Sequence, residues 1–174
     1  MDNNKPLVTG LFRDRDSAEH AYRSASERGY TTSDVNLAMS DETRRRHFGD
    51  LGGRQTELGT KAAKGAGVGG AIGGTVGAIA ASIAAVGTSL AIPGLGVVIA
   101  GPLAAALAGA GAGGATGGLV GALVGAGIPE ERVKDYESGI KSGGILMGVR
   151  PRSAEDAGFF ERQWKEAGGT HVYR

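Results

Sequence analysis

The side chains that could carry out chemistry are few and scattered in this sequence. Its three histidines, His20, His47 and His171, stand far apart, and no two of them have the spacing of a metal site. The chain has no cysteine, which excludes disulfides and thiolate ligands. No GxSxG, HExxH or P-loop motif occurs, and the neighbouring Glu130 and Glu131 are explained as the first turn of a helix. The sequence therefore indicates no enzyme, no cofactor and no metal.

One glycine string has the letters of a nucleotide-binding motif. Residues 65–70 satisfy GxGxxG, but no strand precedes them and no acidic residue follows at the required distance. The string is explained by the glycine-rich composition around it. The chain carries 19 basic and 18 acidic residues, and this balance argues against a nucleic-acid partner. No small-molecule substrate is identified.

The most unusual feature is a long stretch without charge. No Asp, Glu, Lys, Arg or His occurs from Gly65 to Pro129, and more than half of these residues are Gly or Ala. Such a segment exposes apolar surface without charges to solvate it. We therefore expect it to be buried in lipid, against other copies of the chain, or in both ways.

Within this stretch, small residues recur at every fourth position, which lets another backbone approach a helix closely. The pattern predicts an antiparallel hairpin of two helices, Gly65–Ile92 and Gly96–Gly127, with a turn at Pro93. We expect a helix-packing interface along two glycine rows, and an apolar stripe on the other side of the first helix that faces lipid or another protomer. The rows are Gly65, Gly69, Gly73, Gly77 and Gly109, Gly113, Gly117, Gly121, Gly125, and the stripe is Val68, Ile72, Val76, Ile79, Ile83, Val86 and Leu90.

The hairpin leads to an expectation about location. At about 1.5 Å per residue, each helix would exceed the roughly 30 Å of a bilayer core. Basic residues precede the hairpin and its turn has none, so the positive-inside rule predicts an inner-membrane protein with both termini in the cytoplasm. Because so many glycines make insertion weak, a cytoplasmic assembly is the alternative. The residues that either contact lipid headgroups or form a solvated linker are Arg44, Arg45, Arg46, Lys61 and Lys64.

The amino-terminal flank reads as strand, helix and strand. An apolar run predicts a strand over 7–12, and Asp16 with Glu19 has the spacing of a capping box for the helix that follows. Gly29 ends this helix, and apolar alternation predicts a second strand over 35–39.

The carboxy-terminal flank repeats the pattern. A helix over 129–142 leads to a strand over 144–149, Ser153 caps the next helix, and a strand closes the chain at 171–173. The letters of 17–21 and 153–157 nearly match, which indicates that the two halves are related. Three aromatic residues at helical spacing are expected to pack in a core or against another protomer: Phe159, Phe160 and Trp164.

These patterns predict an α+β chain: a ferredoxin-like split βαβ sandwich, interrupted by a long antiparallel Gly/Ala-rich helical hairpin. The expected parts are a first βαβ half (1–48), a basic linker leading into a helix (49–64), the glycine-zipper hairpin (65–128), and a connecting helix with the second βαβ half (129–174). Neither half buries enough apolar area to fold alone.

Three segments resemble a family of small bacterial proteins known as general stress, or heat- or low-temperature-induced, proteins. They are Val8–Phe12, Gly127–Glu131 and Tyr136–Leu146. The likeness covers both flanks and the placement of a glycine-zipper insert, which is longer here than in the shorter members. It implies a ferredoxin-like domain and expression under stress, and it carries over no catalytic residue.

We therefore expect a non-enzymatic, homo-oligomeric stress protein whose glycine-zipper helices assemble in or on the membrane and reinforce or remodel it. The alternative is a soluble shell or filament in which the hairpins bury one another. A channel or permeability factor ranks lower, because no polar or charged ring could select a solute. The partners expected are other copies of the chain and membrane lipid, without nucleic acid. For a small-ligand sensor, the sequence shows no convergent polar set.

Overall fold

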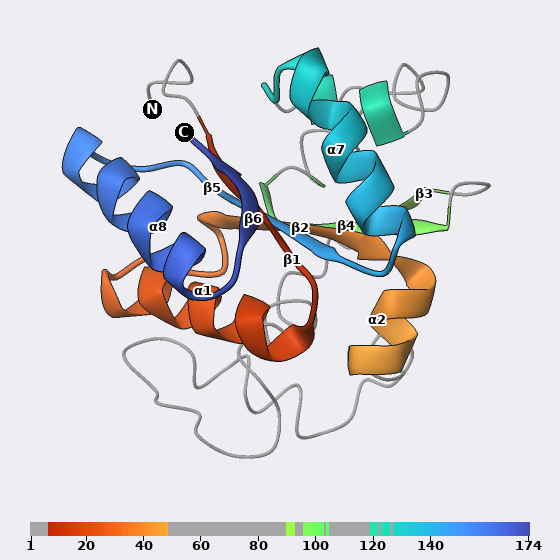
Figure 1. Ribbon diagram of the computed structural model, residues 1–174, viewed down its shortest axis with the longest axis horizontal. Coiled ribbons are helices and arrows are strands. Elements are labelled where there is room, and N and C mark those ends of the chain that lie inside the picture. The colour runs from red at the N-terminus through yellow and green to blue at the C-terminus, as the bar shows by residue number, and fades with distance from the viewer. Residues whose placement is uncertain are drawn as a thin grey trace.

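The computed structural model describes residues 7–48, 90–92, 96–102, 104, 119–121, 123–125 and 127–174, with the backbone alone described at 90–92. Within this part the protein is mixed α/β, with helices on both faces of an antiparallel sheet (Figure 1). The elements are β1 (Val8–Phe12), α1 (Arg15–Glu27), β2 (Val35–Ser40), α2 (Asp41–Phe48), β3 (Leu90–Ile92), β4 (Val97–Ala100), α7 (Glu130–Lys141), β5 (Ile145–Val149), α8 (Ala154–Glu166) and β6 (Thr170–Tyr173).

The sheet interleaves the two ends of the chain. Its strand order is β3-β4-β2-β5-β1-β6, and every neighbouring pair is antiparallel. β5 lies between the two strands of the amino-terminal flank, so that Val149 is opposite Val8 on one side and Val35 on the other. Each flank therefore completes the hydrogen bonding of the other. The strands and helices expected in both flanks are present, with ends shifted by one or two residues.

One face of the sheet packs against α1 and α8, which lie side by side (Figure 1). Phe160 and Trp164 of α8 are fully buried there, and the Trp164 ring meets Phe12 edge to face with centroids 5.8 Å apart. A Cβ atom at Gly10 would lie 3.1 Å from the Trp164 ring, so this strand position leaves room for the indole. The aromatic residues of α8 thus serve the core, with Phe159 half-buried at its margin.

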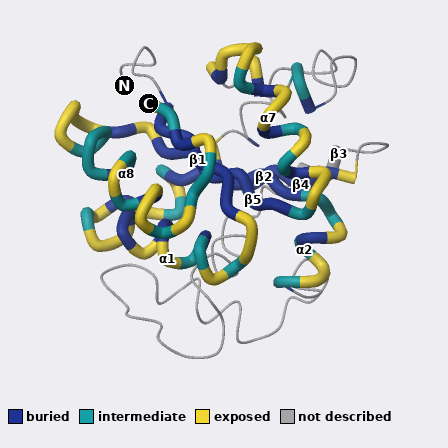
Figure 2. The backbone as a smooth tube through the Cα atoms, in the orientation of Figure 1, coloured by how far each residue is buried: buried dark blue, intermediate teal, exposed yellow. Residues whose placement is uncertain are grey.

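The opposite face packs against α7 and against residues of the uncharged segment. Val133, Tyr136 and Ile140 of α7 are fully buried on this side. Leu119 and Leu123 join the same cluster. Buried residues follow the sheet through the middle of the molecule, while exposed residues lie on the outer sides of the helices (Figure 2). Part of the glycine-rich segment is therefore a core layer of the domain.

The cap of α1 differs from the prediction. The Asp14 side chain, not Asp16, accepts a hydrogen bond from the backbone N–H of Ser17, at 2.8 Å. Ser153 caps α8 as expected, accepting from the backbone N–H of Asp156 at 3.0 Å. Since Asp14 and Ser153 are equivalent caps, the letter match between 17–21 and 153–157 lies three residues out of structural register. Asp16 instead stands in the first turn of α1, where a carboxylate favours the helix dipole.

The predicted helical hairpin is wrong on both sides of its turn, whereas the described residues of 119–125 are helical as expected. Residues Leu90–Ile92 and Val97–Ala100, expected at the ends of the two helices, are the β3 and β4 strands, with Leu90 opposite Ile99. β-branched side chains at 97–99 favour a strand, and Gly101 has a φ of +97° that no helix contains. A Cβ atom at Gly101 would collide with the Val35 carbonyl oxygen, so glycine lets the end of β4 approach β2.

The inner-membrane location with cytoplasmic termini is also contradicted. Among the described helices, none combines the length and the apolar character that crossing a bilayer requires. In addition, the residues on either side of the expected turn are the strands β3 and β4, and β4 pairs with β2 inside the domain. The remainder of the predicted hairpin lies outside the described residues.

Candidate functional site

Most of the predicted helix-packing interface lies outside the described residues. This applies to Gly65, Gly69, Gly73, Gly77, Gly109, Gly113 and Gly117, and in the apolar stripe to Val68, Ile72, Val76, Ile79, Ile83 and Val86. Leu90, the last member of the stripe, is in β3 instead of a helix. Gly121 and Gly125 are described, and both have helical backbone.

The described helical residues of 119–125 have two different faces. Leu119 and Leu123 are buried against α7 and the sheet. Val124 is 42% exposed and is the one exposed large hydrophobic side chain in the described part of the chain. A Cβ atom at Gly121 or Gly125 would have no described atom within 4 Å. The outer face is therefore made of small and apolar groups, and no described residue covers it.

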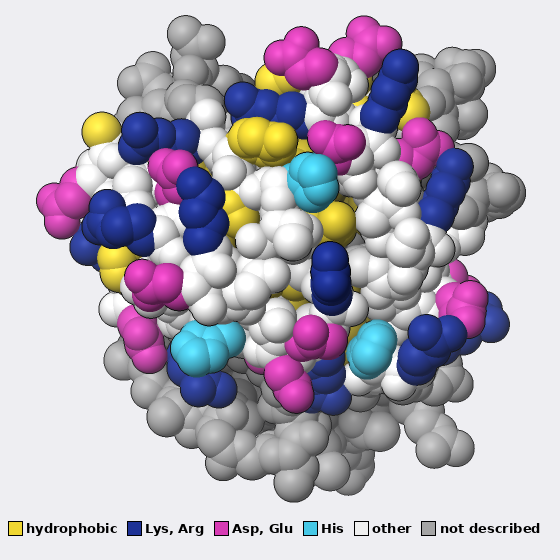
Figure 3. Space-filling view, in the orientation of Figure 1, with side chains coloured by type: hydrophobic (Ala, Val, Ile, Leu, Met, Phe, Trp, Pro, Cys, Tyr) yellow, Lys and Arg dark blue, Asp and Glu magenta, His cyan; other side chains and the backbone are white. Residues whose placement is uncertain are grey.

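The predicted lipid-contact cluster is partly explained by local ion pairs. Arg44 and Arg45 pair with Asp41 of α2 at 2.9 and 2.6 Å, and Arg46 pairs with Glu42. These pairs follow helical i,i+3 and i,i+4 spacing and suit the dipole of a short helix. Lys61 and Lys64 lie outside the described residues. On the side of the molecule in Figure 3, basic and acidic side chains alternate and form no large patch of one sign.

A polar cluster links the two flanks beside the sheet face that α1 and α8 cover. Asp156 of α8 accepts hydrogen bonds from the Tyr30 hydroxyl at 2.6 Å and from Arg28 at 2.5 Å. The Arg152 backbone N–H donates to the Tyr30 hydroxyl at 2.7 Å, and the Arg152 guanidinium pairs with Asp34 at 3.2 Å. Because every partner here is committed to another protein group, we interpret the cluster as a structural clamp.

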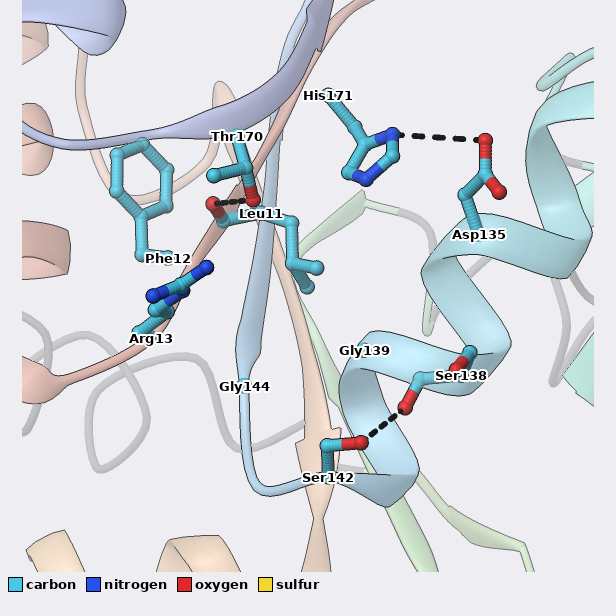
Figure 4. A pocket seen from close by; sticks show the side chains of 10 residues that line it. All are labelled: Leu11, Phe12, Arg13, Asp135, Ser138, Gly139, Ser142, Gly144, Thr170 and His171. Atoms are coloured by element: carbon cyan, nitrogen blue, oxygen red, sulfur yellow. Dashed lines mark hydrogen bonds and ion pairs between the residues drawn. The ribbon is translucent and has the colours of Figure 1, made fainter.

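A cleft of about 420 Å³ opens between the end of β1, the start of β6 and α7 (Figure 4). Its apolar floor is Leu11, and polar side chains surround it; Phe12 also borders the cleft, but its ring is buried against Trp164 on the other face of the sheet. Glycines at the base serve packing, since a Cβ atom at Gly139 would collide with Leu11 and one at Gly144 would lie 2.9 Å from the Gly139 carbonyl oxygen. The polar side chains of the lining are Arg13, Asp135, Ser138, Ser142, Thr170 and His171.

His171 has an unusual backbone at the rim of this cleft. Its φ is +49°, the one positive φ of a non-glycine residue in the described ranges. The pairing of β1 with β6 steps from Thr9↔Tyr173 to Leu11↔Thr170, so β6 carries one extra residue there, a β-bulge. The imidazole Nδ1 lies 3.4 Å from an Asp135 carboxylate oxygen of α7, across the cleft mouth (Figure 4).

Buried hydroxyl groups hold the backbone of the bulge in place. The Tyr136 hydroxyl donates to the His171 carbonyl oxygen at 2.9 Å and lies 2.6 Å from the Thr9 hydroxyl. Because Tyr136 has a single hydroxyl hydrogen, Thr9 is the donor in the second bond. Burial, the largest cause, raises the pKa of Tyr136 to about 12, so the phenol keeps its proton at neutral pH. Tyr136 and Thr9 are both buried.

The cleft was missed at the sequence level because its polar groups come from three separate segments. One signal was available: Asp135, Ser138 and Ser142 recur at i, i+3 and i+7, which places them on one side of α7. Nothing in the sequence marks the bulge that brings His171 to the same place. In the residues that the structure describes, no three His, Cys, Asp or Glu side chains gather as metal ligands.

Comparisons with models of protein families, with curated proteins and with solved structures give no match. The functional argument therefore rests on the residues of this chain.

Proposed function

We propose that this protein is a non-enzymatic, self-associating protein in which a ferredoxin-like domain carries a glycine-rich contact segment. Copies would meet through the outer face of 119–125 and the glycine row that precedes it. The observation that carries the proposal is the face formed by Gly121, Val124 and Gly125, which no residue in the described part of the chain covers. A stress-related role is the further part of the proposal, and it rests on the resemblance of the two flanks.

The ferredoxin-like assignment is supported by the arrangement of four strands. The order β2-β5-β1-β6, with α1 and α8 on one face, is what two interlocked βαβ units would produce. On this view β3, β4 and α7 are additions, and the insert between β2 and β5 extends the sheet beyond β2. The additions also cover the sheet face that the two units leave open.

Self-association follows from the chemistry of the insert. The second glycine row continues back from Gly121 through Gly117, Gly113 and Gly109, and no charged residue interrupts it. A row of small residues on a helix lets a second backbone approach closely and gain dispersion contacts. The opposite face of the described helical residues of 119–125 is already buried in the core of its own copy, through Leu119 and Leu123. A second copy of the chain is thus the partner that the row fits best.

The test replaces two glycines of the row by larger polar side chains, which block close approach without adding apolar surface. The double variant Gly121→Gln/Gly125→Gln should leave the domain folded, since both Cβ positions are open and Gln favours helix over Gly. We expect the unmodified protein to form a multiple of 17.5 kDa and the variant to fall toward 17.5 kDa, as measured by light scattering during size exclusion.

The matched control places the same side chains on another exposed helix face. Arg23→Gln/Ser26→Gln alters exposed positions of α1 and should leave the mass of the assembly unchanged. A monomeric unmodified protein would contradict the proposal, as would a Gly121→Gln/Gly125→Gln variant with the mass of the parent. The fluorescence of Trp164, the single and fully buried tryptophan, reports whether each variant is folded.

A further inference from the structure

We propose that the cleft between β1, β6 and α7 binds a small organic anion, one that carries a carboxylate or phosphate group together with hydroxyl or amino groups. Arg13 would anchor the anionic group, and His171, which lies beyond Leu11 and Thr170 from Arg13 in Figure 4, would contact another part of the ligand from the rim. This site is independent of self-association, since its lining residues belong to the two flanks and not to the glycine row.

The first reason is the state of Arg13. It is exposed, lines the cleft, and makes no ion pair with any residue that the structure describes. Most arginines in the same part of the chain are paired: Arg15, Arg28, Arg44, Arg45, Arg46, Arg152 and Arg174 each have a carboxylate within 4.0 Å. A guanidinium presents several N–H donors in a fork that matches a carboxylate or phosphate.

The second reason is the strained backbone at His171. A left-handed conformation costs a non-glycine residue on the order of 1 kcal/mol, and such residues cluster at functional sites. Here the bulge places the imidazole at the cleft, where the Asp135 carboxylate lies 3.4 Å from Nδ1. The other ring nitrogen points away from Asp135 (Figure 4). It is therefore available to a ligand.

The third reason is that the bulge is rigidly supported. The Tyr136 hydroxyl donates a hydrogen bond to the His171 carbonyl oxygen and accepts one from the Thr9 hydroxyl, on the sheet face that α7 covers. A β-bulge by itself protects an edge strand from pairing with another chain, so protection of the edge does not explain the buried hydroxyl groups. A chain of this kind fits a rim residue that must keep one position.

The hydroxyl groups define the rest of the ligand. The Thr170 hydroxyl donates to the Leu11 carbonyl oxygen at 3.2 Å, and the Ser142 hydroxyl donates to the Ser138 carbonyl oxygen at 2.9 Å. Since their hydrogens are used, these oxygens offer lone pairs to the cleft. Together with the Asp135 carboxylate, they favour a ligand with its own donors. An anion with hydroxyl or amino groups satisfies both sets.

The binding test uses the full chain and two hydroxylated anions. Ribose 5-phosphate and gluconate carry the phosphate and the carboxylate respectively, and neutral ribose serves as the reference; each is titrated calorimetrically up to millimolar concentration. We expect at least one anion to bind and ribose to bind at least tenfold more weakly. Whichever anion binds more tightly identifies the anionic group. Absence of binding by both anions would overturn the proposal.

Three variants assign the binding to the cleft. Arg13→Gln should weaken the anion at least tenfold, whereas Arg23→Gln, an exposed arginine outside the cleft, should leave the affinity unchanged. His171→Asn removes the imidazole while tolerating a positive φ, and should weaken binding several-fold with the Trp164 fluorescence unaltered. Equal affinities in Arg13→Gln and Arg23→Gln would show that the cleft is not the site.

Discussion

Asp156 is the residue through which the two flanks share two of their closest polar contacts. Its carboxylate is 14% exposed and receives hydrogen bonds from Tyr30 and Arg28, which belong to the other end of the chain. The hydrogen bond from the Tyr30 hydroxyl, followed by that from Arg28, lowers the pKa of Asp156. Tyr30 changes in the opposite direction: burial first, and then the bond to Asp156, raises its pKa to about 12.

A pH dependence of stability follows from the lowered pKa of Asp156. A carboxyl group whose folded pKa lies below its unfolded value, about 3.9, stabilises the fold above that value and loses this effect as the pH falls through the folded pKa. Asp156→Asn should therefore cost about 1–2 kcal/mol at pH 7 and less at pH 3. Urea midpoints at the two pH values, followed by Trp164 fluorescence, measure the difference.

The neighbouring Glu155 provides the control. Its carboxylate is 81% exposed and lies 3.4 Å from Arg28, so Glu155→Gln should keep the pH dependence of the parent protein. If Asp156→Asn and Glu155→Gln had the same pH dependence of stability, Asp156 would not be its source.

At the scale of elements, two glycines within helices have opposite surroundings. Gly139 of α7 lies against the Leu11 side chain, and an added Cβ atom would collide with it. Gly158 of α8 would place a Cβ atom 3.5 Å from the end of the Arg162 side chain, an ordinary contact. The first glycine permits α7 to reach the sheet, and the second has no such role.

Alanine at the two positions should change stability in opposite directions. Gly139→Ala should destabilise the protein by about 1–3 kcal/mol, because the strain at Leu11 exceeds the gain in helix propensity. Gly158→Ala should stabilise it by roughly 0.5–1 kcal/mol through propensity alone. Urea denaturation of both variants provides the comparison. A stabilised Gly139→Ala protein would mean that α7 does not pack as closely as described.

The elements of the flanks could be predicted because their signals are local. Apolar alternation marks Val35–Ser40, and a helix propensity pattern with Ser153 as its cap marks α8. The strands inside the uncharged segment could not be separated from helix on periodicity, since short apolar runs between glycines fit both. What decides between them at Val97–Ala100 is pairing with β2, a contact distant in sequence.

The cleft was beyond sequence reasoning for a related reason. Leu11, Asp135 and Thr170 lie far apart along the chain. They meet only after β6 pairs with β1 and α7 packs on the sheet face opposite α1 and α8. The positive φ of His171 arises from the register shift of that pairing. Residue types alone gave no reason to connect His171 with Asp135.

At the scale of the whole molecule, the described parts of the uncharged segment belong to the domain that the segment interrupts. Its β4 strand extends the sheet beyond β2, and its Leu119 and Leu123 help to cover the second face. A helical rod from residue 65 to residue 92 would instead hold its tip about 42 Å from the domain. The two arrangements differ most in the distance between β2 and β4.

An engineered disulfide measures this distance directly. Met39 of β2 lies opposite Val98 of β4, and directly opposed residues of an antiparallel pair have Cα atoms about 4.5–5.5 Å apart, within the range of a disulfide. The chain has no cysteine of its own, so Met39→Cys/Val98→Cys would contain one pair of thiols. We predict that mild oxidation links them within one chain, with loss of both free thiols and faster migration in a denaturing gel. Two thiols that stay free in the folded protein, or that link only between copies, would contradict the placement of this segment in the sheet.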